Sequence, residues 1–533
     1  MKYAITEEDK SLILQPSLQY KYRLLVVDDE YILDEIQGIS AIGSYSIDSE
    51  SDIRRTTSFT LMLDNCYRTI MSVEKKLLTW IGYDFQMQIG IYSLRKNDFV
   101  WFDCGYYLIT EGNTSYNSTD NSLNLNLCDW YSKLNGTRNG QVGGRINVEY
   151  KNVDDNGDKI TIKDTTEIIL KTETMFNSYI VEDIGEPNGM KQSNSNYLEY
   201  RDKCPLWNQL PYDLKYEAGC TVGDIFDEIK NIYPNCEMCF DIYGNFCFNM
   251  IPSFEHDSVV LDDSYLQKIL LAQNTESVTY DVESIKNVTE VFGNTYQPDR
   301  FSTNVTTNGN IYTALLDSYE GYSNNHMIAF TPNSSNISEM KISINSLDAL
   351  PIFYEYTDTY IEEGLLVANK TYVLQIRLSG SDYVAYYLGQ FQPHALCVLT
   401  DNENDPKYTK KYFAEKYNCN ERNITFRVEP ESPFTIQKLG EILDVKTGEK
   451  FDNILSDSVA IQNAICYNLQ SSSVYDTVQI YTKMIPFLDV NEKVEYRKQQ
   501  ETESKQYIVK LINNDMESMT SQITMYRFYP LII

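Results

Sequence analysis

The stretch SDIRRTTSFTL (residues 51–61) is the part of the sequence that decides the fold. Two further stretches are read with it, NLCDWYSKLNG (126–136) and PFLDVNEKVEY (486–496). A fourth, EAGCTVGDIFDEIKNIYPNCEMCFDIYGNFCFNM (217–250), lies between them in the chain. Paired arginines and Asp-Trp dipeptides are common on their own. The order of four such stretches over more than 440 residues is much harder to reach by chance.

Most of the hydrophobic patterning has a period of two, which is typical of strands with one buried face. Apolar and polar residues alternate in FQMQIGIY (85–92) and in the run 123–128. The same alternation returns near 424–428, 507–511 and 522–525. The sequence therefore predicts two β-rich blocks, one in each half of the chain.

Three helices are predicted. Thr221 and Asp224 form an N-terminal cap, and apolar residues then recur at helical spacing, which predicts a helix over 221–233. A Tyr-Gly-Asn turn after it predicts a β-hairpin over 235–251. Ser432 before Pro433 predicts a helix near 433–443, and Ser458 opens another near 458–469.

The composition is that of a folded protein of several domains. The 533 residues are 42% hydrophobic and 13% aromatic, and the formal net charge is −31. Such an acidic chain lacks the basic footprint of a nucleic-acid binder. Solubility alone is an alternative explanation for the acidity. No apolar leader or membrane-spanning run is present, so we expect folding in a reducing cytoplasm and no membrane anchoring.

Candidate chemistry fails on inspection, so we expect no enzyme, cofactor or metal site. Cys236 and Cys239 form a CxxC pair, but residues three apart in a strand point to opposite faces, which opposes a shared zinc ion. The EF-hand-like run at 153–159 has Lys159 where the loop needs glycine. None of the 3 histidines lies in a recognisable catalytic or metal motif.

The four quoted stretches, in this order, resemble the hub proteins that close the distal end of bacteriophage tail tubes. The resemblance implies a β-dominated α+β, multi-domain fold. It would contain two tail-tube-like β-barrels in one chain, decorated by small α/β and β insertions. The resemblance also implies a homotrimer, in which six barrels would let a three-fold tip dock on a six-fold tube.

The expected domain order follows from this resemblance together with the periodicity. We expect an N-terminal arm at 1–40, a first barrel at 41–136 and an insertion at 137–204. An α/β element at 205–296, a β-rich insertion at 297–395 and a second barrel at 396–533 would complete the chain.

The implied function is structural: closing the tail tube and forming a channel for DNA. Implied partners are the tube or a distal tail protein ring, other tip or baseplate proteins, the tape-measure protein, and DNA only in transit. The location would be the tail tip or baseplate of the virion, assembled in the host cytoplasm. A carbohydrate-binding receptor-recognition protein and a tail-tip glycoside hydrolase, which needs two suitably spaced carboxylates, remain alternatives.

Arg54 and Arg55 are the candidate site residues. They could merely solubilise a sheet edge. We favour ion pairs with carboxylates across a subunit boundary, because acidic copies repel one another unless basic residues lie at the seams. We also expect acids to outnumber bases on the channel wall, since each basic contact to phosphate would hold DNA.

Overall fold

The computed structural model describes residues 3–529 with gaps. The gaps are 29–30, 37–38, 63–79, 81, 110–114, 118, 120, 145–146, 155–158, 182–209, 211–212, 233–235, 251–257, 272–275, 282, 355–357, 449–450, 453 and 473. The latter part of the predicted insertion 137–204 and the last residue of the predicted helix 221–233 therefore lie outside the described residues. Within the described part, no helix is long and apolar enough to cross a membrane.

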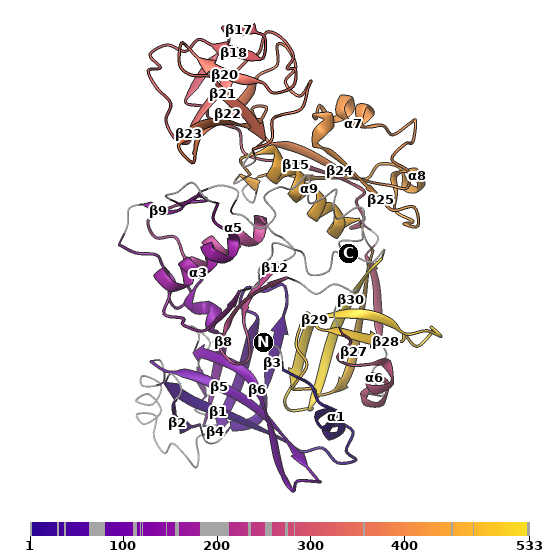
Figure 1. The fold of residues 1–533 in the computed structure, drawn as a ribbon. Coiled ribbons are helices and arrows are strands. Elements are labelled where there is room, and N and C mark those ends of the chain that lie inside the picture. The colour runs from indigo at the N-terminus through magenta and orange to yellow at the C-terminus, as the bar shows by residue number, and fades with distance from the viewer. Residues whose placement is uncertain are drawn as a thin grey trace.

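The largest element is a 13-stranded sheet built from both ends of the chain (Figure 1). Its path is β14-β27-β30-β29-β3-β4-β8-β6-β5-β1-β2, with β28 paired to β29 and β7 to β8. The N-terminal strands are β1 (Tyr20–Asp28), β2 (Tyr31–Glu35), β3 (Ile39–Asp48), β4 (Arg55–Met62), β5 (Asp84–Ser93), β6 (Asp98–Ile109), β7 (Ser115–Asn117) and β8 (Ser122–Asp129). The others are β14 (Ser277–Asp281), β27 (Val474–Lys483), β28 (Lys493–Tyr496), β29 (Lys505–Asp515) and β30 (Thr520–Tyr529).

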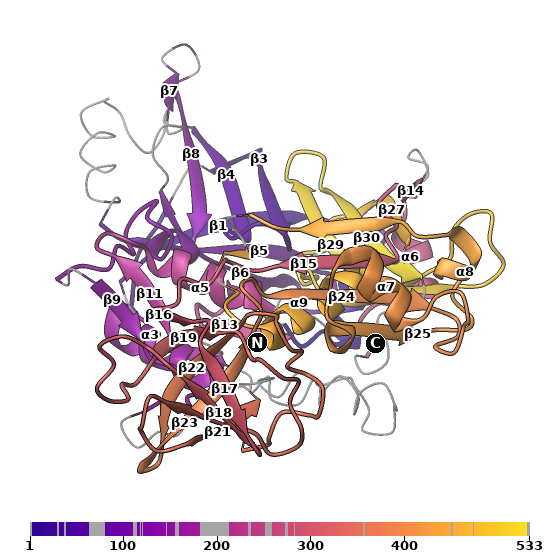
Figure 2. The same ribbon diagram turned by 90° about the horizontal axis from the view of Figure 1, so that it is seen from above.

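The two predicted β-rich blocks are thus joined edge to edge. Antiparallel pairing of β29 with β3 makes the join, and Figure 2 shows β3, β4 and β8 continuing into the yellow C-terminal strands. One core cluster contains residues of both blocks, and the rings of Phe102 and Phe487 meet within it at 5.4 Å. The predicted alternation is confirmed in β5, whose Phe85, Met87 and Ile89 are fully buried. The β-dominated, multi-domain fold class is confirmed, and the sheet includes one nearly closed barrel.

The described elements of the first 40 residues belong to this sheet and its core rather than to a separate arm. Helix α1 (Glu7–Ile13) begins with a capping box between Thr6 and Asp9 and buries Leu12 and Ile13 in the shared core. Strand β1 then pairs with β5 along eight positions, from Tyr20 to Val27. Its hydrophobic run, buried at Leu24–Val27, is the signal that the sequence analysis left unused.

A first α/β unit follows η1 (Trp130–Lys133) and contains the predicted helix and hairpin. Helix α5 (Val222–Ile232) is capped by Thr221, whose Oγ1 accepts from the Asp224 backbone N–H at 3.0 Å. The predicted hairpin is confirmed as β12 (Cys236–Phe240) and β13 (Phe246–Met250). The remaining elements are β9 (Asn147–Tyr150), α3 (Ile162–Glu173), β10 (Tyr179–Val181) and β11 (Leu214–Glu217).

The described part of the predicted insertion 137–204 belongs to the same unit. Strand β10 extends the hairpin by parallel pairing with β13, and β9 pairs with β11. Helices α3 and α5 bury their apolar faces in one core cluster. The polar composition of 137–204 concealed this role, because the buried positions of its described part are spread over several short segments, including Val142, Val148 and Ile169.

A second α/β unit occupies much of the range that was predicted as the second barrel. Its strands form the separate sheet β25-β24-β15-β26, and three of them lie between residues 394 and 446. The prediction of one barrel over 396–533 is therefore wrong in its first part, because strand alternation does not reveal which sheet a strand joins. The elements are β15 (Val288–Phe292), β24 (His394–Thr400), α7 (Lys410–Tyr417), η2 (Glu421–Asn423), β25 (Ile424–Val428), α8 (Ile436–Leu439), β26 (Leu443–Lys446), α9 (Asp457–Ser471).

Two of the predicted helices lie in this unit. Helix α9 begins after Ser456, whose Oγ accepts from the Val459 N–H, and it extends the predicted 458–469 helix slightly at both ends. The helix predicted near 433–443 is only the single turn α8. Gly440, at φ 77°, ends it, and the chain continues into β26, which pairs with β15.

The range 297–395 forms mainly one eight-stranded sheet at the top of Figure 1, in the order β16-β19-β22-β23-β21-β20-β18-β17. These strands are β16 (Arg300–Ser302), β17 (Val305–Asn308), β18 (Ile311–Ala314), β19 (His326–Phe330), β20 (Lys341–Ile344), β21 (Leu350–Tyr354), β22 (Tyr372–Ser379) and β23 (Asp382–Gly389). Helix α6 (Asp263–Ile269) packs beside β28 near the C-terminal strands.

Candidate functional site: the junction between the strand blocks

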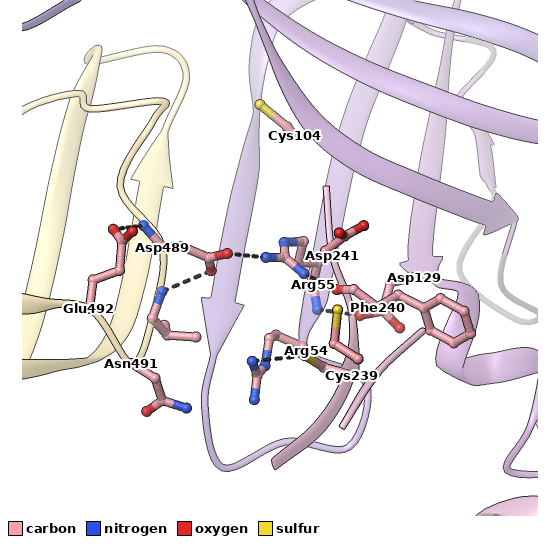
Figure 3. A network of polar contacts seen from close by, with 12 residues as sticks. Arg54, Arg55, Cys104, Asp129, Cys239, Phe240, Asp241, Asp489, Asn491 and Glu492 are labelled. Atoms are coloured by element: carbon pink, nitrogen blue, oxygen red, sulfur yellow. Dashed lines mark hydrogen bonds and ion pairs between the residues drawn. The ribbon is translucent and has the colours of Figure 1, made fainter. Parts of the chain in front are cut away.

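Arg54 directly precedes β4 and Arg55 is its first residue (Figure 3). Their exposed fractions are 4% and 2%, so neither solubilises a sheet edge. Alternation along β4 turns Arg55 to the buried side and Thr56 to the open side. A buried guanidinium must be paired and hydrogen-bonded to remain in the fold.

Arg55 connects three parts of the chain. Its guanidinium pairs with Asp489, in the loop between β27 and β28, and donates from Nη1 to the Phe240 carbonyl of β12 at 2.5 Å. Its backbone N–H donates to Asp129 Oδ2, at the end of β8, at 2.8 Å. Arg55 therefore fixes the first strand block to both the hairpin and the second block.

Arg54 makes the parallel connection to the hairpin. Its Nη1 lies 2.7 Å from Glu237 Oε2 and 3.0 Å from Cys239 Sγ, both on β12. Burial opposes the charge on Arg54, but Cys239, Glu237 and Asp489 favour it more strongly, so the pKa of Arg54 is raised. The guanidinium stays charged, which an ion pair at this depth requires.

Asp129 is the second acid beside Arg55. Burial raises the pKa of Asp129 to about 6, although the N–H groups of Arg55 and Tyr131 oppose the shift. Its Oδ1 accepts from the Tyr131 N–H at 3.0 Å and thereby caps the short helix η1. Asp129 thus ends one strand and starts the next element at the same point.

These five residues form what we call the junction cluster: Arg54, Arg55, Asp129, Glu237 and Asp489. Each of the four stretches quoted at the outset contributes to it. The sequence analysis predicted that Arg54 and Arg55 pair with carboxylates across a subunit boundary. The contacts in the structure are within one chain, so the seam that they form joins parts of that chain. Periodicity could not have found the partners, although three of the quoted stretches contain the acids.

On the open side of the same strands lies a continuous polar surface. Directly opposed residues of neighbouring strands share a face, so the pairing registers place one set of side chains together. We call this set the polar face: Thr477, Gln479, Tyr481, Thr520, Gln522, Thr524, Leu511, Asn513, Ser44, Ser46, Thr56, Ser58, Thr60, Asn124 and Asn126.

Hydrogen bonds run across the polar face from strand to strand. Gln522 Nε2 donates to Tyr481 Oη at 2.8 Å, and Ser46 Oγ donates to Asn513 Oδ1 at 2.7 Å across the join of the two blocks. On the other flank, Thr60 Oγ1 donates to Asn124 Oδ1 at 2.8 Å. The polar face is therefore an ordered, hydrophilic surface that continues across the boundary between the two blocks.

Charge is nearly absent from the polar face. The charged residues that the described part of these strands adds to the same side are two acids and two bases, Asp48, Asp515, Lys483 and Lys510. Three of them are the last residues of their strands, and Lys510 pairs with Glu50. The acidic excess expected for a channel wall is not found on this face, which is neutral instead.

The described residues hold no group of three His, Cys, Asp or Glu side chains placed to bind a metal ion. Cys236 and Cys239 lie on β12, and both are buried free thiols. Burial raises the pKa of Cys239 to about 12, so its sulfur remains a protonated thiol beside Arg54.

Comparison with known proteins gives a consistent likeness. Residues 431–532 match a family model described as a domain of unknown function, DUF5048. No curated protein matched the chain. The solved structures that the chain resembles include three described as tail proteins.

Three of these structures show the extent of the likeness. The tail protein of Neisseria meningitidis MC58 is 8% identical, with a TM-score of 0.43 over 95% of this chain and 96% of that one. Prophage tail protein gp18 of Listeria monocytogenes EGD-e is 9% identical, with a TM-score of 0.41 over 95% and 94%. The 43 kDa tail protein of prophage MuSo2 from Shewanella oneidensis is 8% identical, with a TM-score of 0.40 over 95% and 97%.

Proposed function

We propose that this chain is a structural hub protein of a phage tail, in which the polar face lines a passage for DNA. The observation that carries the proposal is the continuous polar face across β27, β30, β29, β3, β4 and β8. Two strand blocks of one chain share this face and a single core behind it. Because the two blocks share one sheet and one core, a single chain could form one repeat of a ring.

The chemistry of the face suits transit without retention. Lysine and arginine contacts to phosphates release counterions and so add affinity for DNA. The uncharged hydroxyls and amides of the polar face offer no such contact, and they keep the wall wet. A neutral wall differs from the negative wall that the sequence predicted. Either wall would let DNA pass without binding it.

The proposed assembly is a homotrimer at the distal end of the tail, inside the virion. Three copies would place six strand blocks around the channel, docked on the tail tube or a distal tail protein ring. Other tip or baseplate proteins and the tape-measure protein would be its neighbours. In this role the protein is no enzyme, and the buried junction cluster keeps the two blocks of each copy in register.

The deciding experiment is the mass of the purified protein by light scattering, followed by electron microscopy of the particles. We expect a trimeric ring with the polar face on the inner wall. A chain truncated after residue 420 loses β27 to β30, and it should form no ring. A monomer at high concentration, or a ring with the polar face turned outward, would contradict the proposal.

A further inference from the structure

A partly open cavity of about 210 Å³ lies where the eight-stranded sheet meets the second α/β unit, far in sequence from the junction cluster. Its walls come from the segment after β23, the start of β24, the turn after α7 and the first residue of α9. The volume is below the ~300–1,000 Å³ of pockets that take drug-sized ligands. It therefore fits one small ring rather than an extended chain.

Amide side chains dominate the lining. Five are present: Gln390, Gln392, Asn418, Asn420 and Asn423. Three of them are engaged, since Gln392 Nε2 donates to the Gly293 carbonyl at 2.8 Å and Asn423 Nδ2 to the His394 carbonyl at 2.8 Å. Asn420 Oδ1 accepts from the Arg422 N–H at 3.1 Å. The side-chain amides of Gln390 and Asn418 have no hydrogen-bond partner within the described residues, so their donors and acceptors remain for a ligand.

The charges around the cavity exclude an anionic ligand. Asp457 lies in the wall, and its Oδ1 accepts from the His394 N–H at 3.2 Å. The His394 ring is stacked on Phe292 at 4.2 Å and held by Glu290 Oε1 at 2.8 Å. No lysine or arginine is among the described residues that line the cavity, and the His394 ring is already paired with Glu290, so phosphate or carboxylate finds no unpaired cationic side chain here.

An aromatic pair lies at this cavity. Phe391 lines it and is 40% exposed, and its ring centroid is 6.2 Å from that of Phe301, which is 50% exposed. Large aromatic side chains usually bury most of their surface, so two exposed neighbours beside a polar cavity indicate a surface for a ligand. Such a ring presents a flat apolar face beside a wall of hydrogen-bonding groups.

We propose that this cavity binds one ring of a neutral saccharide. Pyranose rings combine an apolar face of C–H groups with a rim of hydroxyls that both donate and accept. Phe391 would pack against the apolar face, while Gln390 and Asn418 bind hydroxyls and Asp457 accepts from one. The site goes beyond the proposed hub role and does not rest on it.

The test is titration of the full chain with the methyl glycosides of glucose, galactose, N-acetylglucosamine and rhamnose, followed by ligand-observed NMR. We expect at least one sugar to bind with a Kd on the order of 1 mM. Phe391→Ala and Gln390→Ala should each weaken binding by about tenfold or more, equivalent to about 1.4 kcal/mol. Tyr243→Ala is the matched control, because Tyr243 is similarly exposed at 46% but lies on the hairpin turn.

Circular dichroism of each variant shows whether it is folded, so that a loss of sugar binding can be distinguished from unfolding. Binding that is lost in both cavity variants and kept in Tyr243→Ala supports the proposal. It is overturned if none of the four sugars binds at about 20 mM, well above the expected Kd. It is also overturned if both folded cavity variants bind like the wild type, or if inorganic phosphate binds in place of the sugars.

Discussion

At the residue scale, Arg55 has the largest predicted effect, because its buried side chain contacts two separate parts of the chain, Asp489 and the Phe240 carbonyl. Arg55→Ala would leave Asp489 buried without this partner, which typically costs about 3–5 kcal/mol. Arg55→Lys should recover little, since one ammonium cannot reproduce the forked contacts. We expect a large drop in the urea midpoint, measured by tryptophan fluorescence.

The surface pair between Lys171 and Glu167 gives the control for this prediction. It has a similar geometry, at 3.1 Å, but Lys171 is largely exposed. Lys171→Ala should cost only about 0.5 kcal/mol or less. If Arg55→Ala had an effect as small as this control, the junction cluster would not hold the strand blocks together.

The raised pKa of Asp457 makes the stability of the fold depend on pH in the opposite direction to that of an acid whose pKa is lowered. Burial raises the pKa of Asp457 from 3.8 to about 7, against hydrogen bonds from Asn423 and His394. Between these pH values the folded chain keeps a proton that the unfolded chain has released. The free energy of unfolding therefore falls as pH rises through this window, by at most about 1.4 kcal/mol per unit.

Asp457→Asn should remove that slope. We expect the melting temperature of the variant, relative to the wild type, to rise from pH 5 to pH 7 and then to level off, in differential scanning calorimetry. Asp262→Asn is the control, because a hydrogen bond from Ser264 lowers the pKa of Asp262, and its contribution is lost only as pH falls below about 4. A constant difference for Asp457→Asn over the same range would refute the assignment.

At the element scale, helix α5 should be the most sensitive to a cavity. Phe226 is fully buried, and its ring contacts that of Phe246 at 5.0 Å. Phe226→Ala should cost about 3–5 kcal/mol. Ile168→Ala on the exposed side of α3 is the matched control, and urea unfolding of both variants measures the difference. A loss below about 1 kcal/mol for Phe226→Ala would mean that the site collapses around the smaller side chain.

The same scale shows what local sequence could predict. Alternation and capping residues located β5, β8, α5 and the β12–β13 hairpin, because these signals lie within a few residues of one another. Partner choice was out of reach. Strand β14 pairs with β27, nearly 200 residues later in the chain. Strands β24 and β25 lie in the predicted second barrel but belong to a separate sheet. Both outcomes depend on packing between distant segments, which no local period records.

The candidate site was predictable to a similar degree. Arg54 and Arg55 were predicted to pair with carboxylates at a subunit boundary, whereas the acids that they contact here are in the same chain, in stretches already singled out. Their pairing depended on β12, the end of β8 and the loop between β27 and β28 meeting beside the start of β4, so it could not be predicted without the fold. The polar face was hidden for a different reason. Serine, threonine and asparagine at alternate positions indicate an open strand face, but only the β29–β3 join makes six such faces into one.

At the scale of the whole molecule, three substitutions would make the neutral polar face positively charged. Thr56→Lys, Asn124→Lys and Thr524→Lys would place ammonium groups on β4, β8 and β30. In a ring these charges would line the passage, and each phosphate contact would add affinity that falls steeply with salt. We expect the triple variant to bind DNA at low salt, whereas the wild type does not.

The position of the lysines, rather than their number, is what this prediction tests. Thr303→Lys, Thr306→Lys and Ser381→Lys add the same charge to exposed positions of the eight-stranded sheet region. DNA binding by fluorescence anisotropy, repeated over a series of salt concentrations, compares the two variants in their assembled form. A ring that surrounds DNA gathers the contacts of all its copies, so the face variant should bind far more tightly. Equal binding by the two variants would show that the polar face does not line a passage.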